Sequence, residues 1–452
     1  MKSIKKNENY DLKIIELGKN GEGIGYIEGK KVFVNNCIPG DELKVKIIKV
    51  SKNYMVGKPI KSIKKSKDHV EPKCLYYKLC GGCQIQMMDY QRQLEEKKNR
   101  VDYILNDIHG LSVKVEDTLG MDNPYDYRNK SSVPVSMTKS GPIMGFYKKN
   151  SHDIVDIDNC IIQNPKMNTV LNIFKSFIKE KNIPVYDEKS HTGLIKQLMI
   201  RTSRIEDKFM VIVVVNGDQV DSIELLIEEL KNIDGFASLI LNINKEKTNR
   251  IMGYENKVIY GQEVLVDRIL DMNFEISPNS FFQINPVQTD TLYSKVLEYA
   301  DLKGNETVYD LYCGIGSITG FLAKNAKKVY GIEVVQVAVE NARKNMELSN
   351  IENTEFFAGK AEELIESLAS EKERPDIVVV DPPRKGCEES VLKTIADIEV
   401  ERIVYVSCLP ESLGRDLEYL VSRGYKIEKV QPVDMFCHSY HVETVCKLKL
   451  LK

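Results

Sequence analysis

The stretch VYDLYCGIGSITG, residues 308–320, decides the fold of this chain. A β-branched and apolar segment ends at two closely spaced glycines, Gly314 and Gly316, and a helix-forming segment follows from Ser317. Glycines at this place allow a tight turn from a strand into a helix and a close approach of a ligand to the backbone. From about residue 275 onward, strand-like and helix-like segments alternate. This alternation predicts an α/β fold, a doubly wound and mostly parallel sheet with helices on both faces.

Acidic residues end two further strands of the predicted sheet. Glu333 closes GIE (331–333), about 20 residues after the glycine turn, where a carboxylate accepts hydrogen bonds from ribose hydroxyls. Asp381 closes the strand in DIVVVDPPRKG (376–386). A nicotinamide-binding turn would show GxGxxG, but Thr319 stands where the third glycine belongs. The DPP sequence at this place resembles S-adenosylmethionine-dependent methyltransferases, so we expect that cofactor.

A cysteine ends another strand, in RIVYVSCLP (402–410). A small buried apolar residue is the ordinary role of such a cysteine. On the cofactor side of a methyltransferase sheet, however, the Cys408 thiolate could add to carbon 6 of a pyrimidine and activate carbon 5. Carbon 5 must then lose a proton, which requires a base. Glu443 opens an antiparallel last strand at the same edge, while His438 and His441 are rival bases.

Five motifs together resemble the RNA uracil-5-methyltransferases: DLYCGIG, DPPRKG, SCLP, HVETV and NSFFQIN (279–285). The resemblance implies Cys408 as the nucleophile and Glu443 as the base. It implies contacts with S-adenosylmethionine by Gln283, Tyr312, Glu333 and Asp381, beside the turn of Gly314 and Gly316. One departure is Leu409, where the family commonly has Asn.

Four cysteines could form a metal site. Cys74, Cys80 and Cys83 lie in CLYYKLCGGCQ (74–84), and Cys160 is a candidate fourth ligand. Four thiolates suit an iron–sulfur cluster or zinc, and spacing alone does not separate the two. Uracil methyltransferases that act on 23S ribosomal RNA resemble this chain in carrying a [4Fe-4S] cluster on such a pattern behind a TRAM domain. Relatives that act on transfer RNA typically lack both.

The N-terminal segment reads as a small antiparallel barrel of short strands between glycine turns. It resembles a TRAM domain through GEGIGYIEGKKVFV (21–34) and the PGD turn (39–41). Residues 1–67 hold 16 lysines and 7 acidic residues, a charge surplus that fits a polyanion partner and a merely solvated face equally well. We expect a barrel over 1–65, a linker over 61–73, an α+β domain with the metal site over 66–270, and a methyltransferase domain over 271–452. A helix over 87–108 should pack on the catalytic domain.

Composition and charge indicate a cytoplasmic protein. The chain has 452 residues, 42% of them hydrophobic, and no apolar run approaches the ~20 residues of a membrane span. Its ten cysteines are therefore expected to be thiols or metal ligands. We predict a monomer, with no membrane contact and no obligate protein partner. Its predicted partner is ribosomal RNA, bound at a loop or flipped uridine.

RNA contacts are predicted at two kinds of residue. Phe281 and Phe282 could stack on a base, although core packing is the commoner role of such a pair. Basic side chains could hold phosphates at Arg128, Lys130, Lys148 and Lys149. The sequence thus predicts an enzyme that makes 5-methyluridine in 23S ribosomal RNA. Alternatives are a cytosine-5 methyltransferase, an enzyme acting on transfer RNA, and an inactive RNA-binding iron–sulfur protein.

Overall fold

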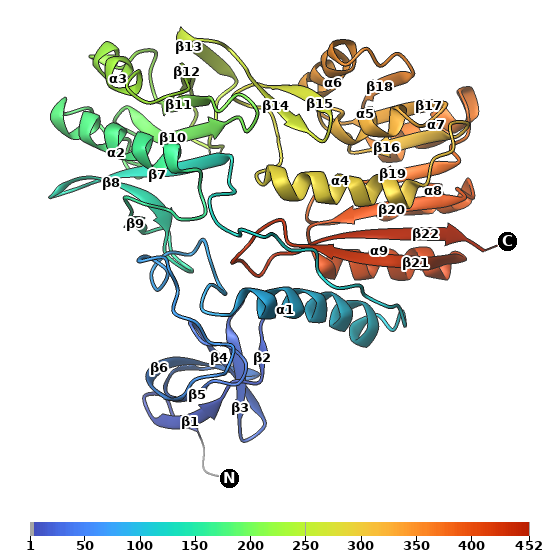
Figure 1. Cartoon of the computed structure of the whole chain (residues 1–452). Coiled ribbons are helices and arrows are strands. Elements are labelled where there is room, and N and C mark those ends of the chain that lie inside the picture. The colour runs from blue at the N-terminus through green and yellow to red at the C-terminus, as the bar shows by residue number, and fades with distance from the viewer. Residues whose placement is uncertain (1–3, 249, 452) are drawn as a thin grey trace.

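The computed structural model describes residues 4–248 and 250–451. It contains three main sheets, arranged as a small N-terminal barrel, a central sheet and a C-terminal sheet flanked by helices (Figure 1). Helix α1 lies between the barrel and the red strands of the C-terminal sheet in the same view. In the described ranges, no helix is long and apolar enough to cross a membrane.

The N-terminal barrel has six strands in the order β1-β5-β6-β4-β3-β2. All neighbours are antiparallel except β4 and β6. Its core is made of alternate apolar side chains that include Val32, Val45 and Met55. The linker predicted from residue 61 is wrong at its start, because β6 continues to Lys64, which pairs with Glu42 of β5. The strands are β1 (Asn9–Lys13), β2 (Glu16–Leu17), β3 (Gly23–Ile27), β4 (Lys30–Val34), β5 (Glu42–Val50) and β6 (Tyr54–Lys64).

The predicted helix over 87–108 is α1 (Tyr90–Asp102), continued by one wider turn, η1 (Tyr103–Ile108). The Asp89 side chain caps its N-terminus by accepting a hydrogen bond from the Gln91 amide. Val101 and Leu105 belong to the same buried cluster as the helices on one face of the C-terminal sheet. The helix therefore packs against the C-terminal part of the chain rather than against the central sheet.

The central sheet has the order β13-β12-β11-β10-β7-β8-β9 and is mainly antiparallel. Helices α2 (Pro165–Glu180) and α3 (Ile223–Leu230) pack on this sheet in one buried cluster. The strands are β7 (Lys130–Thr138), β8 (Gly141–Tyr147), β9 (Ile154–Asp156), β10 (Ile195–Thr202), β11 (Phe209–Val215), β12 (Phe236–Ile243) and β13 (Glu255–Gly261).

The C-terminal sheet confirms the predicted doubly wound fold. Its order is β18-β17-β16-β19-β20-β22-β21. The first five strands in this order are parallel, and β22 is antiparallel to both of its neighbours. The strands are β16 (Thr307–Leu311), β17 (Lys328–Glu333), β18 (Thr354–Ala358), β19 (Ile377–Val380), β20 (Arg402–Ser407), β21 (Tyr425–Val433) and β22 (Glu443–Leu450). Two buried clusters, one on each face, hold the helices against the sheet.

Helices in this part follow the predicted alternation closely. They are α5 (Ser317–Ala323), α6 (Gln336–Leu348), α7 (Ala361–Glu371), α8 (Glu389–Asp397) and α9 (Pro410–Ser422). The sequence reasoning missed α4 (Pro286–Ala300) and the hairpin of β14 (Leu265–Ile269) and β15 (Met272–Ile276). Asn285 and Pro286 are the signal for α4, since the Asn285 side chain caps the helix and proline suits its first position.

Candidate active site

The candidate nucleophile and base lie side by side at the carboxyl edge of the C-terminal sheet. Cys408 directly follows β20, and Pro410 begins α9. Ser407, the last residue of β20, pairs with Thr444, so the start of β22 lies against the end of β20. Glu443, with 5% of its surface exposed, is therefore next to Cys408 in space although it follows Cys408 by 35 positions in the sequence. Asp381 follows β19 at the same edge.

Burial and mutual charge set the proton affinities of this group. Burial, with the negative charge of Asp381, raises the pKa of the Glu443 carboxyl to about 8. Burial, with the charges of Glu443 and Asp381, raises the pKa of the Cys408 thiol to about 11. Burial also raises the pKa of Asp381 to about 7. Such perturbed groups gathered at one edge are typical of an active site.

Arg384 is a site residue that the sequence reasoning missed. Its guanidinium lowers the pKa of both Cys408 and Glu443. A cation near the thiol favours the reactive thiolate, because an unassisted thiol is mostly protonated at neutral pH. The residue stands in the DPPRKG motif itself, so the motif was the available signal. Its side chain is exposed, which leaves it accessible to an anionic substrate.

The loop that carries Arg384 is fixed from α9. The buried Asp416 carboxylate accepts hydrogen bonds from the Cys387 amide at 2.8 Å and from the Tyr405 hydroxyl at 2.6 Å. Arg415 donates to the Lys385 carbonyl at 2.9 Å. Gly386 has φ of 81°, and a Cβ there would lie 2.5 Å from the Asp416 carboxylate. Only glycine fits this turn, so the backbone of the DPPRKG loop is held in one conformation.

The glycine turn after β16 is built as a cofactor loop. Gly314 and Gly316 have φ of 57° and 78°, which glycine adopts without strain. The Gly314 amide donates to the Glu333 carboxylate at 3.1 Å, so this carboxylate joins the turn to the end of β17. A Cβ on Gly314 would meet no atom within 4 Å, which leaves space beside the turn.

Asp310 supports the assignment of a cationic cofactor to this space. Burial raises the pKa of its carboxyl to about 7. Its Oδ2 accepts a hydrogen bond from the Thr319 hydroxyl at 2.5 Å, while its Oδ1 has no partner among the described residues. A buried carboxylate oxygen without a donor suits the ammonium and sulfonium charges of S-adenosylmethionine. The residues present therefore fit that cofactor.

Two predicted cofactor residues lie at the margin of this loop. Tyr312 has φ of 65° and packs its ring against the buried cluster that contains Cys387. Gln283 is half-buried, and its carbonyl accepts a hydrogen bond from the Asn129 side chain at 3.0 Å. Contacts of Tyr312, Gln283, Glu333 and Asp381 with the cofactor stay predictions, as do the roles of Cys408 and Glu443.

The rival bases are poorly suited to proton removal. Burial lowers the pKa of His438 and of His441 to about 4 in each case, so both rings bind protons much more weakly than Glu443 does. His438 is 2% exposed and lies between the rings of Tyr90 and Tyr125. The geometry favours Glu443 as the base.

The four cysteines Cys74, Cys80, Cys83 and Cys160 come together from distant parts of the sequence. Burial raises the pKa of the Cys83 thiol, and the charges of Cys160, Cys80 and Cys74 raise it further. The Gly82 amide donates to the Cys80 sulfur at 3.4 Å, a bond common around iron–sulfur clusters. Within residues 4–248 and 250–451, however, no group of three or more His, Cys, Asp or Glu side chains is arranged to hold a metal ion. The metal site stays a prediction.

The predicted RNA contacts separate into exposed and structural residues. Phe281 is 72% exposed, whereas Phe282 is 5% exposed and belongs to the core. Arg128, Lys130 and a third cation, Arg201, lie close together. Burial and the charges of the two arginines therefore lower the pKa of Lys130 to about 8. Lys148 pairs with Asp153, and Lys149 donates to the Asn36 side chain of the barrel.

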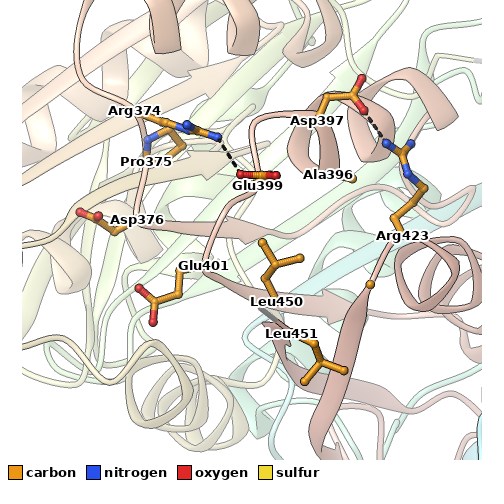
Figure 2. A pocket seen from close by; sticks show the side chains of 11 residues that line it. Arg374, Pro375, Asp376, Ala396, Asp397, Glu399, Glu401, Arg423, Leu450 and Leu451 are labelled. Carbon is orange, nitrogen blue, oxygen red and sulfur yellow. Dashed lines mark hydrogen bonds and ion pairs between the residues drawn. The ribbon is translucent and has the colours of Figure 1, made fainter.

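A surface hollow at the opposite end of the C-terminal sheet is unrelated to this site (Figure 2). It lies where β19 and β20 begin and where β22 ends. Four of its charged side chains form pairs, Arg374 with Glu399 and Arg423 with Asp397. In an open α/β sheet the ligand belongs at the carboxyl ends of the strands, where Cys408 lies.

Fold and site together define a class of enzyme, the S-adenosylmethionine-dependent methyltransferases, here with a small barrel in front of the catalytic sheet. Two family models match this chain. Residues 89–450 match "tRNA (Uracil-5-)-methyltransferase", and residues 5–60 match the TRAM domain. The chain belongs to the tRNA (uracil-5-)-methyltransferase family, and it is an RNA uracil-5-methyltransferase that uses S-adenosylmethionine.

Relatives span the whole chain. An uncharacterized RNA methyltransferase of Clostridium tetani is 46% identical over 98% of this chain and 96% of its own length. One of Clostridium acetobutylicum is 46% identical over 99% and 98%. Among solved structures, the Pyrococcus abyssi tRNA (uracil-54, C5)-methyltransferase in complex with S-adenosyl-L-homocysteine is 28% identical, with a TM-score of 0.79, over 97% of this chain and 100% of that one.

Replacing Arg384 with Gln should move the chemistry to higher pH. Glu443 must be a carboxylate to accept a proton, so turnover should rise as the pH increases through about 8. Without the guanidinium, the pKa values of Glu443 and Cys408 increase, and the rise should shift upward by roughly one pH unit. The rate of Cys408 alkylation by iodoacetamide, measured against pH, should shift in the same direction. Lys385→Gln is the control, and an unchanged profile for Arg384→Gln would contradict this role.

Proposed function

We propose that this protein methylates carbon 5 of a uridine in 23S ribosomal RNA through a covalent adduct between Cys408 and the uracil ring. The pairing of Ser407 with Thr444 supports the proposal best, because it puts the thiol and the Glu443 carboxylate at one edge beside the cofactor turn. Membership of the uracil-5-methyltransferase family supports the same chemistry.

In the proposed steps Cys408 is first the nucleophile and finally the leaving group, and Glu443 acts in between. The Cys408 thiolate forms a bond to carbon 6 of the uracil, and the electrons of the 5,6 double bond move into an enolate that makes carbon 5 nucleophilic. S-adenosylmethionine, when bound, supplies the electrophilic methyl group and leaves as S-adenosylhomocysteine. The Glu443 carboxylate then removes the proton from carbon 5. The electrons of that bond restore the 5,6 double bond and expel Cys408 as a thiolate.

A flipped uridine would enter from the side of the central sheet. Phe281 offers an exposed ring beside the predicted cofactor residue Gln283. The loop that holds Phe281 is fixed by the buried Arg201, which donates to the carbonyls of Pro278 and Ser280. Arg128 and Lys130 lie next to Arg201 and suit backbone phosphates. Stacking and phosphate contacts of this kind are common in the recognition of unpaired RNA bases.

The choice of ribosomal RNA rests on the N-terminal half of the chain. The TRAM domain and the four gathered cysteines are the features that the 23S-specific relatives share in the resemblance described above. Transfer RNA is the second candidate substrate, because the similar Pyrococcus abyssi enzyme is a tRNA (uracil-54, C5)-methyltransferase.

The proposal also includes a [4Fe-4S] cluster on Cys74, Cys80, Cys83 and Cys160, with a structural role. The cations Arg128 and Lys149 lie close to these thiols, and Arg128 lowers the pKa of Cys83 and Cys160. Positive neighbours favour thiolates, which are the form that binds iron. The cysteines belong to the proposed middle part of the chain, residues 66–270, between the barrel of 1–65 and the methyltransferase part of 271–452.

Trapping experiments test the nucleophile and the base. With 5-fluorouridine RNA and cofactor, the wild-type protein should form a stable adduct, because fluorine at carbon 5 cannot leave as a proton does. Cys408→Ala should form none. Glu443→Gln should accumulate the methylated adduct on ordinary uridine RNA, seen as a shifted band in denaturing gels. Cys37→Ala, which removes a buried thiol in the core of the barrel, is the control, and an adduct with Cys408→Ala would contradict the mechanism.

Substrate choice can be measured directly. Purified protein and labelled cofactor should methylate 23S ribosomal RNA transcripts at least tenfold faster than transfer RNA transcripts at equal concentration. Mass spectrometry of ribosomal RNA from a strain without this protein should show the missing 5-methyluridine and its position. Loss of the modification from transfer RNA alone would reverse the ranking of the two substrates.

Metal analysis tests the cysteine site. Protein purified without oxygen should be brown and contain iron and acid-labile sulfide in equal amounts. Cys83→Ser should lose most of the iron, because removal of one thiolate from a four-thiolate cluster leaves an iron without its ligand. Cys37→Ala, in the core of the barrel, should keep it. A colourless protein that holds zinc instead would contradict the cluster.

A further inference from the structure

The connection between β21 and β22, residues 434–442, is unusual because it is almost entirely buried. Asp434, Met435 and Cys437 have no exposed surface, and His438 is 2% exposed. Connections normally run over the surface, since buried backbone groups lose their hydrogen bonds to water. This connection leads directly into Glu443, the proposed base. The residues that form hydrogen bonds with its polar groups therefore also determine the position of Glu443.

Several of these polar groups are satisfied by residues 84–100, far away in the sequence. The amides of Gln84 and Ile85 both donate to the His438 carbonyl, at 3.0 and 3.1 Å. The Arg100 guanidinium donates to the Tyr440 carbonyl at 2.7 Å, and the Tyr440 amide donates to the Gln84 side chain at 3.3 Å. Gln84 directly follows Cys83. Backbone hydrogen bonds therefore join the loop that carries Cys80 and Cys83, here called the cysteine loop, to the connection.

A buried ion pair forms the centre of this contact. Lys97 of α1 pairs with Asp434, and neither side chain has any exposed surface. The Lys97 ammonium also donates to the Phe436 carbonyl at 3.1 Å, and the Tyr90 hydroxyl donates to the second oxygen of Asp434 at 2.7 Å. Removal of one partner from such a pair leaves an uncompensated charge in the interior, which disrupts the surrounding structure far more than loss of a surface pair does.

The first residues of the connection also have partners outside residues 84–100. Asn285 and Gln288, at the start of α4, donate to the carbonyls of Met435 and Asp434. Tyr127 donates to the Cys437 carbonyl at 3.1 Å. After Tyr440 the chain reaches Glu443 within three residues. Residues 84–100 thus supply the hydrogen bonds to Tyr440, three residues before the proposed base.

We propose that residues 84–100 form a brace that positions Glu443, and that Lys97 acts through Asp434 as a positioning residue for removal of the proton from carbon 5. The inference rests on the proposed function of Glu443 as the base. Among the described residues, Arg100 forms the ion pair that joins the brace to the nucleophile side, with Glu411 of α9. Loss of Lys97 should therefore slow the removal of the carbon 5 proton by Glu443. The addition of Cys408 to carbon 6 should keep its rate.

The variant Lys97→Met tests the brace. The neighbouring Lys98→Met is the matched control, since Lys98 lies on the surface and pairs with the exposed Asp117. Lys97→Met should lower kcat on the order of ten- to a hundredfold, the effect of a small misplacement of a catalytic group. The KM for RNA should change little. The fraction of enzyme present as a methylated adduct on ordinary uridine RNA should rise several-fold, while the rate of Cys408 alkylation stays at the wild-type value.

The milder variant Tyr90→Phe removes one hydroxyl that donates to Asp434, and it serves if Lys97→Met does not fold. It should accumulate adduct in the same way but to a smaller extent. If Glu443→Gln accumulates adduct and neither brace variant does, the brace is wrong and the base assignment stands. If none of the three accumulates adduct, the base assignment fails and the brace fails with it. Slower Cys408 alkylation in the brace variants would show a general structural effect and overturn the positioning role.

Discussion

The antiparallel register of β22 against β20 is the constraint on which the site depends. Because Ser407 is opposite Thr444, the end of one strand and the start of the other meet at the carboxyl edge of the sheet. A slip by one residue would turn every side chain of β22 to the other face. Val445, Cys446 and Leu448 are fully buried between the helix layers, and their packing prevents such a slip. The packing of an apolar strand thus determines the relation of Cys408 to Glu443.

Burial is also the source of the unusual proton affinities at this edge. Glu443, Asp381 and Asp310 all have raised pKa values, with burial as the largest cause in each case. A carboxyl with a pKa near the working pH can act as a base in one step and release the proton afterwards. Arg384 opposes the shift from an exposed position, so the balance at the site depends on one charge on a loop that Arg415 and Asp416 hold.

The N-terminal half of the chain does more than precede the catalytic sheet. Residues 84–100 form hydrogen bonds with polar groups of the buried connection before Glu443. The barrel packs against residues of the same contact. Gly21 has φ of 78°, and a Cβ there would lie 2.7 Å from the Cβ of Gln84 and 3.4 Å from that of Tyr440. Lys149 joins the barrel to the neighbourhood of the cysteines. The barrel, the cysteine loop and the connection before β22 are therefore parts of one packed region.

By itself the sequence determined the local features: the glycine turn of residues 314–316, the alternation of strands and helices from residue 307, and the placing of Asp381 and Cys408 at strand ends. Such features depend on neighbouring residues, through turn chemistry and side-chain periodicity. Only the tertiary structure decided which distant groups share an environment. It brought Arg384 to Cys408, Lys97 to Asp434, and Cys160 to the other cysteines. Electrostatic interaction and burial depend on distance in space, and packing sets that distance for residues hundreds of positions apart.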